Sequence, residues 1–271
     1  MTTQTQPTLT FTGSIPQHYD QYQGPMFFED YAIDVANRIN VSSANDVLEL
    51  SCGTGRVTNH IRRVLHPTSK LTASDVSPDM LEVAKQKLMG STIDWQIIDF
   101  TKIPFADKSL DLVVCCFGYM FAENKEQAFA EAFRVLRDSG SLLIATWDKL
   151  EYNEASHVFR KTVKKYLGES VPAMYNLPFS MNDSEVIKQQ LRKVGFSKVE
   201  VELVEKQSKA ESAKKATYGM VQGGTLYNEI SKSNPAWVEE IAATVEKELS
   251  EKYGAAPMIA PMRALVTQAW K

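Results

Sequence analysis

Short apolar segments alternate with amphipathic ones between residues 46 and 147, and this alternation constrains the fold more than any other feature of the sequence. The segment Leu110–Phe117 (LDLVVCCF) is almost entirely apolar, which is typical of a strand covered on both faces. Strands alternating with helices form βαβ units, so the pattern predicts an α/β fold with a mostly parallel sheet. The expected strands are 46–50, 71–74, 93–98, 110–117 and 142–147, and the helices between them are 56–65, 78–89 and 125–136.

The segments on either side of this region have mainly helical spacing. After Trp147 we expect helices at 154–167, 182–194, 210–222 and 235–253, and strands at 198–205 and 262–270. Another helix is expected at 26–39. No linker or repeat marks a boundary, so we expect a flexible arm at 1–14 and a single domain at 15–271. Its core would be about 40–150 and 196–271, and helical additions at about 15–39, 151–195 and 207–258 would cover a site.

Composition excludes several classes of protein. The chain has 271 residues, of which 44% are hydrophobic and 23% charged, so it is not mainly disordered. Its net charge of −3 gives no general attraction to nucleic acid, and no apolar run is long enough for a membrane span. Cys52, Cys115 and Cys116 do not form a disulfide or zinc pattern, and no metal site is expected. We therefore expect a cytoplasmic protein without nucleic-acid partners, and its oligomeric state stays open.

A glycine-containing turn carries the strongest chemical signal. Glu49–Gly55 (ELSCGTG) lies where a buried strand gives way to a helix, and its glycines let the backbone approach a ligand closely. Asp75 ends the second strand, 20 residues after Gly55, where a carboxylate accepts hydrogen bonds from ribose hydroxyls. The alternatives are a tight turn without a ligand and an aspartate that only caps a helix. Together the two features favour a nucleoside ligand.

The same turn indicates which nucleoside is bound. A dinucleotide-binding GxGxxG motif counted from Gly53 requires glycine where the chain has Thr58. Glu49 directly before the turn would repel a pyrophosphate but suits a ligand that carries an ammonium group and a sulfonium. An NAD-binding oxidoreductase on a similar sheet is therefore the weaker alternative.

Four further segments follow in order: 75–81 (DVSPDML), 98–111 (IDFTKIPFADKSLD), 116–119 (CFGY) and 129–140 (FAEAFRVLRDSG). With the turn, they resemble the motifs of class I S-adenosylmethionine-dependent methyltransferases of the small-molecule type, similar to the ubiquinone/menaquinone-biosynthesis C-methyltransferases. Ser51 replaces the first glycine of the usual first motif. The resemblance implies a Rossmann-like, doubly wound seven-stranded sheet of order 3-2-1-4-5-7-6, with the last strand antiparallel. It also implies S-adenosyl-L-methionine as the cofactor.

The resemblance further assigns residues to the cofactor. Asp75 would bind the ribose, Val76 would contact adenine, and Asp99 would lie near the adenine amino group. Phe100 would supply a backbone N–H and an apolar wall. Tyr19 belongs to an N-terminal segment that resembles the part of these enzymes folding over the methionine end. The full set of expected cofactor-binding residues is Tyr19, Glu49, Ser51, Cys52, Gly53, Thr54, Gly55, Asp75, Val76, Met80, Asp99, Phe100, Cys116 and Phe117.

Catalysis and the acceptor are less constrained. A sulfonium is already electrophilic, so a base is needed only when the acceptor must lose a proton. The candidates are Tyr19, His18, His157 and Tyr119; for the histidines an exposed position, and for Tyr119 simple packing, are the alternatives.

The fourth motif lacks the Asn/Asp-Pro-Pro run that binds planar amides and adenine amino groups, which argues against nucleic acid. Aromatic residues in the additions favour a small apolar or aromatic acceptor: Tyr166, Tyr175, Phe179, Tyr218 and Tyr227. The predicted function is methyl transfer to a small organic molecule by in-line displacement. A non-catalytic S-adenosylmethionine-binding module is the other alternative, and the acceptor and the methylated atom stay open.

Overall fold

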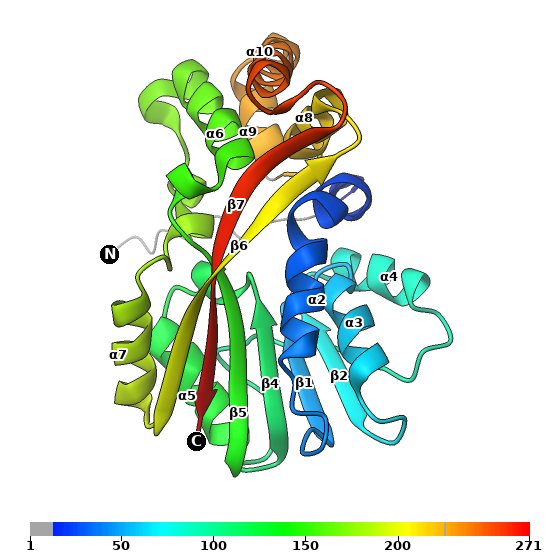
Figure 1. Cartoon of the computed structure of the whole chain (residues 1–271), viewed down its shortest axis with the longest axis vertical. Coiled ribbons are helices and arrows are strands. Elements are labelled where there is room, and N and C mark those ends of the chain that lie inside the picture. The colour runs from blue at the N-terminus through cyan, green and yellow to red at the C-terminus, as the bar shows by residue number, and fades with distance from the viewer. Residues whose placement is uncertain (1–12, 225) are drawn as a thin grey trace.

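A seven-stranded mixed sheet forms the centre of the protein in a computed structural model that describes residues 13–224 and 226–271 (Figure 1). The strand order is β3-β2-β1-β4-β5-β7-β6. The strands are β1 (Asp46–Leu50), β2 (Lys70–Asp75), β3 (Asp94–Ile97), β4 (Leu110–Cys116), β5 (Leu136–Trp147), β6 (Lys198–Ala210) and β7 (Met258–Trp270). Only β7 runs antiparallel to its neighbours β5 and β6. The expected Rossmann-like order and the antiparallel last strand are confirmed.

Helices cover the sheet and bury its central strands. Those next to the sheet are α2 (Glu29–Asn37), α3 (Arg56–Val64), α4 (Pro78–Lys87), α5 (Lys125–Val135) and α7 (Ser184–Val194). In β4 nearly every successive residue is buried, which requires cover on both faces. Helix α4 begins as expected, because the Ser77 hydroxyl accepts a hydrogen bond from Met80 N–H and Pro78 occupies the first turn.

A long two-stranded arm extends beyond the sheet. Strands β6 and β7 pair from Lys198 with Trp270 to Ala210 with Met258, whereas β5 follows β7 only as far as Ala264. The arm carries α8 (Ala213–Gln222), α9 (Leu226–Ser233) and α10 (Ala236–Tyr253) at its tip (Figure 1). Helix α6 (Glu154–Leu167) packs against α10. We call these four helices, with the short helical turns η4 (Gly168–Ser170), η5 (Ala173–Tyr175) and η6 (Leu177–Phe179), the cap.

The N-terminal segment reaches the cap. After the single turn α1 (Ile15–His18), a π-helical segment η1 (Tyr19–Phe28) packs against α8 and β6. The short turns η2 (Tyr119–Phe121) and η3 (Leu150–Tyr152) follow β4 and β5. No helix in the described part of the chain is both long and apolar enough to cross a membrane.

Several expected boundaries are corrected. The helix expected at 26–39 is the end of η1 followed by α2; Pro25 lies inside η1, and proline has no N–H for a regular α-helical hydrogen bond. The strand expected to end at Glu205 continues to Ala210, and β7 begins at Met258, because these two extensions pair with each other. Helix α8 therefore begins at Ala213, and α9 was not expected. Of the expected arm at 1–14, residues 1–12 lie outside the described part.

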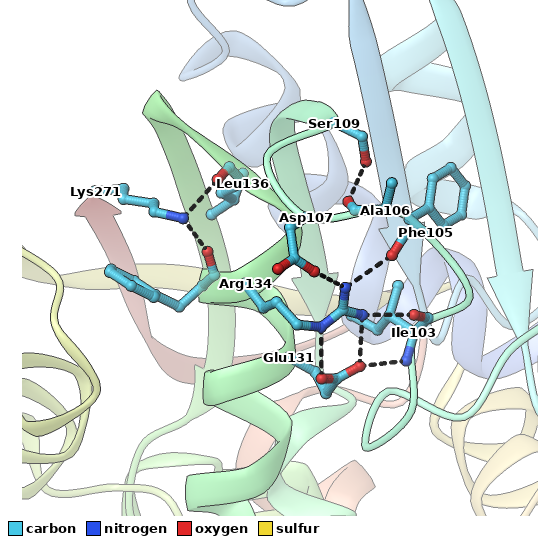
Figure 2. A network of polar contacts seen from close by, with 10 residues as sticks. Ile103, Phe105, Ala106, Asp107, Ser109, Glu131, Arg134, Leu136 and Lys271 are labelled. Atoms are coloured by element: carbon cyan, nitrogen blue, oxygen red, sulfur yellow. Dashed lines mark hydrogen bonds and ion pairs between the residues drawn. The ribbon is translucent and has the colours of Figure 1, made fainter.

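A network around Arg134 fixes the loop between β3 and β4 to α5 (Figure 2). Its guanidinium donates to the carbonyl oxygens of Ile103 and Phe105 (2.8 and 2.9 Å) and pairs with the carboxylates of Asp107 and Glu131 (2.6 and 2.8 Å). Glu131 in turn accepts from Ile103 N–H (2.8 Å). The Arg134 side chain thus provides hydrogen-bond donors for carbonyl oxygens of an irregular loop.

Replacing Arg134 by methionine should lower the free energy of unfolding by about 1–3 kcal/mol, because two loop carbonyls and two carboxylates lose a charged donor. Urea denaturation measures the loss. The matched control is Lys108→Met, which removes only the exposed ion pair with Asp138 and should cost much less. Equal losses for the two variants would contradict a structural role of the network.

Candidate functional site

A cavity of about 380 Å³ opens where β1, β2 and β4 end. Strand β1 pairs with β2 on one side and β4 on the other, so the strand order reverses here, and ligands of open α/β sheets bind at such a point. We call it the strand-end cavity. Its lining residues are Tyr19, Phe28, Ser51, Cys52, Gly53, Thr54, Arg56, Val57, Asp75, Val76, Ser77, Met80, Phe100, Cys116, Phe117, Gly118, Phe121, Glu123 and Leu177.

The bend after β1 has an unusual backbone. Ser51, Gly53 and Gly55 all have positive φ angles, of 54°, 53° and 74°. A Cβ at position 55 would lie 3.0 Å from the Cβ of Ala84, so the glycine also permits close packing of α4. Ser51 adopts a conformation that non-glycine residues rarely hold, and such strain concentrates at functional sites.

Asp75 ties this bend to the end of β2. Its Oδ2 accepts from Gly53 N–H and its Oδ1 from Ser77 N–H, both at 2.9 Å. Burial raises the pKa of the Asp75 carboxyl, and the backbone donors oppose that rise. The carboxylate therefore holds two strand ends together beside the cavity.

Glu49 lies directly behind the bend and is only 1% exposed. Its Oε2 has no hydrogen-bond partner in the described chain. Burial raises the pKa of Glu49 to about 8, and the nearby Asp75 charge adds to the rise. A buried carboxyl without a full set of partners is costly, and it can be balanced by a cationic ligand group.

The N-terminal segment is fastened over the bend by polar contacts. Thr54 Oγ1 donates to Asp20 Oδ1 at 2.6 Å, and Lys87 also pairs with Asp20. Arg56 donates to the carbonyl oxygen of Asp20 at 2.9 Å and pairs with Glu29 at 2.5 Å. These contacts place Tyr19 beside the cavity.

An aromatic wall follows β4. Phe117 has a positive φ of 56° and stacks on Trp147 with ring centroids 4.1 Å apart. Phe28 contacts Phe117 edge-on at 5.3 Å and also lies 5.3 Å from Tyr19. The wall joins residues from η1, β4 and β5.

A second cavity, of about 160 Å³, lies between this wall and the cap, and we call it the aromatic cavity. It shares four residues with the strand-end cavity: Tyr19, Phe28, Phe117 and Phe121. Its other lining residues are Gln23, Phe27, Met120, Trp147, Ser156, Phe159, Arg160, Met174, Pro178, Phe179, Met220, Gly223, Gly224 and Leu226.

Most residues expected to bind the cofactor line the strand-end cavity. They are Tyr19, Ser51, Cys52, Gly53, Thr54, Asp75, Val76, Met80, Phe100, Cys116 and Phe117. Three do not. Glu49 lies behind the bend, Gly55 faces Ala84, and the Asp99 carboxylate is exposed and accepts from both the N–H and the hydroxyl of Thr101 (2.8 and 2.7 Å). Contact of Asp99 with adenine stays a prediction.

Of the four candidate bases, only Tyr19 lines either cavity. His18 packs against the ring of Tyr218, at 5.6 Å between centroids, and His157 lies on α6 outside both cavities. Tyr119 is completely buried between Phe100 and Phe129.

Sequence reasoning did not identify several lining residues. Phe28 lies within the helix expected at 26–39, and Arg56 and Val57 begin the helix expected at 56–65. The available signal for Arg56 and Val57 was their position directly after Gly55. Phe121 follows the fourth expected strand directly, and from this position contact with an acceptor or simple loop packing could be expected. Arg160 and Trp147 belong to no sequence motif, so no local pattern marked them as site residues.

The fold is Rossmann-like, and the strand-end cavity lies where such folds bind nucleosides. Comparison with known proteins indicates the class of protein more closely. Residues 47–140 match the family model described as "Methyltransferase domain". The ubiquinone/menaquinone biosynthesis C-methyltransferase UbiE of Stutzerimonas stutzeri is 31% identical over 145 residues, which cover 52% of this chain and 54% of that protein. The chain thus spans about half the length of the curated relatives it matches.

Solved structures show the same fold. A putative methyltransferase from Bacillus halodurans is similar with a TM-score of 0.56, at 19% identity, over 89% of this chain and 98% of that one. Phosphoethanolamine N-methyltransferase 2 of Haemonchus contortus, in complex with S-adenosylhomocysteine, is similar with a TM-score of 0.60, at 14% identity, over 94% of this chain and 56% of that one. The chain thus carries a methyltransferase domain over residues 47–140 and is similar to class I S-adenosylmethionine-dependent methyltransferases.

The pKa of Glu49 makes stability depend on pH. Between about pH 5 and 8 the folded protein keeps a proton that the unfolded chain releases, so the free energy of unfolding of the ligand-free protein should fall as pH rises. Glu49→Gln should flatten this dependence, as measured by urea denaturation across that range. The exposed Glu240→Gln is the control and should leave the slope unchanged. A wild-type slope in Glu49→Gln would contradict the assignment.

Proposed function

We propose that this chain transfers a methyl group from S-adenosylmethionine, bound in the strand-end cavity, to a small organic molecule bound in the aromatic cavity. The observation that carries the proposal is the pair of adjoining cavities, which share Tyr19, Phe28, Phe117 and Phe121. Such a shared wall is where a donor and an acceptor would meet.

The residues around the strand-end cavity suit this cofactor. Asp75 would bind the ribose, and Val76, Met80 and Phe100 offer apolar surface for adenine. A Cβ at Gly53 would meet no protein atom within 4 Å, so its absence leaves room beside the bend. Glu49 has an unpartnered oxygen, and the cofactor's ammonium group would favour loss of its proton and would then face a carboxylate.

When bound, the cofactor supplies an electrophilic methyl group on a sulfonium sulfur. The new bond forms between the acceptor atom and the methyl carbon, while the carbon–sulfur bond breaks and its electron pair stays on sulfur. The chain's task is to align the two molecules and keep water out, which can contribute about 7–11 kcal/mol. Aromatic faces at the shared wall also attract a cation.

Tyr19 is better suited to positioning than to removing a proton. Burial raises the pKa of its hydroxyl; Arg56 opposes the rise, and Asp75 and Asp20 add to it. The phenol therefore stays protonated at neutral pH. This favours acceptors that are nucleophilic without help from a protein base, such as thiolates, acidic phenols and stabilised carbanions.

We also propose that the acceptor is a small molecule rather than nucleic acid and that the protein acts in the cytoplasm. The net charge of −3 and the mainly apolar lining of the aromatic cavity support the first point. The three free, buried cysteines are consistent with a reducing compartment.

Asp75→Ala should weaken binding of S-adenosylmethionine and S-adenosylhomocysteine at least about tenfold, because the ribose loses its acceptor and the Gly53 bend its anchor. Isothermal calorimetry measures both affinities. Asp79→Ala removes the same charge from an exposed position on α4 and should bind as the wild type does.

Wild-type protein that binds neither compound would overturn the proposal. If both bind, screening phenols, thiols, amines and quinone precursors for release of S-adenosylhomocysteine separates an enzyme from a binding module. An NADH titration tests the oxidoreductase alternative, which the methyltransferase match over 47–140 disfavours.

A further inference from the structure

Arg160, on α6 of the cap, carries a buried charge without a counter-charge. The side chain is partly buried, and its Nη1 atom is buried and has no hydrogen-bond partner in the described chain. Other partly buried arginines are paired: Arg56 with Glu29 and Arg263 with Asp148, both at 2.5 Å. An unpaired charge in such surroundings destabilises a fold, so its retention calls for a ligand.

The surroundings of Arg160 fix its position without neutralising it. The guanidinium carbon lies 4.9 Å from the centre of the Tyr175 ring and 5.2 Å from that of Phe179. The Tyr175 hydroxyl donates to the backbone carbonyl oxygen of Arg160. Cation–π contacts of this kind help to hold the guanidinium in place, while its Nη1 has no hydrogen-bond partner in the described chain.

The guanidinium is charged at working pH. Burial lowers the pKa of Arg160 to about 10, and the adjacent Tyr175 opposes that shift. The side chain therefore presents a full positive charge at pH 7.

Arg160 lines the aromatic cavity, and among the residues that line this cavity it is the one charged group. The rest of the lining is aromatic, aliphatic or neutral polar. A single cation in the mainly apolar aromatic cavity is complementary in charge and polarity to a molecule with one negative charge and a flat apolar body. A planar guanidinium pairs with a carboxylate through two parallel hydrogen bonds, whereas a doubly charged phosphate would leave one charge unbalanced.

We propose that the methyl acceptor is a small aromatic or unsaturated carboxylate whose carboxyl group binds Arg160. The proposal rests on the proposed methyltransferase function and adds the chemical class of the acceptor. Anchoring at Arg160 would direct the rest of the molecule along the cavity toward the shared residues Tyr19, Phe28 and Phe117, beyond which the cofactor would lie.

Matched pairs of probes test this inference: benzoate with benzamide, and cinnamate with cinnamamide. Each pair differs in charge and little in shape. With the protein saturated with S-adenosylhomocysteine, calorimetry or saturation-transfer NMR should show the carboxylates binding at least about tenfold more tightly than the amides. Arg160→Gln should abolish this preference, and Arg160→Lys, which keeps the charge but not the planar fork, should retain part of it. Lys164→Gln, exposed on the same helix, is the charge-matched control and should bind as the wild type does.

Two further readouts separate this role from others. Arg160→Gln should keep the affinity for S-adenosylhomocysteine within about twofold, because Arg160 does not line the strand-end cavity. Failure of the wild type to bind S-adenosylhomocysteine would count against the proposed function, not against the anchor, which the carboxylate–amide pairs then test on the protein alone. Arg160→Gln should also be at least as stable as the wild type in urea without ligand, because it removes an unpaired buried charge.

Equal binding of carboxylates and amides to the wild type, including no binding of either, would overturn the inference. A preference for carboxylates that survives in Arg160→Gln would also overturn it. If that variant is in addition less stable than the wild type, Arg160 has a purely structural role.

Discussion

The hydrogen bond from Gly53 N–H to Asp75 is the contact on which the cofactor site depends. It joins the bend after β1 to the end of β2, while the Asp75 Oδ1 also holds the start of the turn into α4. The bend can keep positive φ angles at Ser51, Gly53 and Gly55 because this neighbouring strand fixes it. The N-terminal segment then closes over the same bend through Asp20 and Thr54, so a single connection positions three parts of the site.

Each cavity adjoins one buried ionisable group that the described part of the protein leaves with an unpartnered polar atom. Behind the strand-end cavity it is the carboxyl of Glu49, and in the aromatic cavity it is the guanidinium of Arg160. An ammonium group close to Glu49 would favour the ionised form of its carboxyl, and a carboxylate would pair with the guanidinium of Arg160.

The sheet and much of the cofactor site could be predicted from the sequence because their signals are local. The apolar runs of β1 and β4, the glycines of the bend and the position of Asp75 lie in short, ordered segments. Asp99 shows the limit of motif reasoning, since its carboxylate caps its own turn at Thr101, a competition that short polar side chains often win. Of the residues that line the aromatic cavity, Tyr19, Phe117 and Phe179 were predicted to lie at a site, whereas Arg160 was not. Arg160 is covered by Tyr175 and Phe179, which contact it only once the cap has folded. No hydrophobic pattern in the sequence indicates these contacts.

The arm formed by β6 and β7 has an evolutionary consequence. Because Ala210 pairs with Met258, the chain leaves and re-enters the arm at neighbouring points, and everything between them is topologically a hairpin loop. Insertions, deletions or exchange of α8–α10 would therefore reshape one wall of the aromatic cavity, which Met220 and Leu226 help to form, without changing the register of any strand of the sheet. Because α8 also packs against η1, a change at the tip of the arm would have to preserve the contact that keeps Tyr19 beside the strand-end cavity.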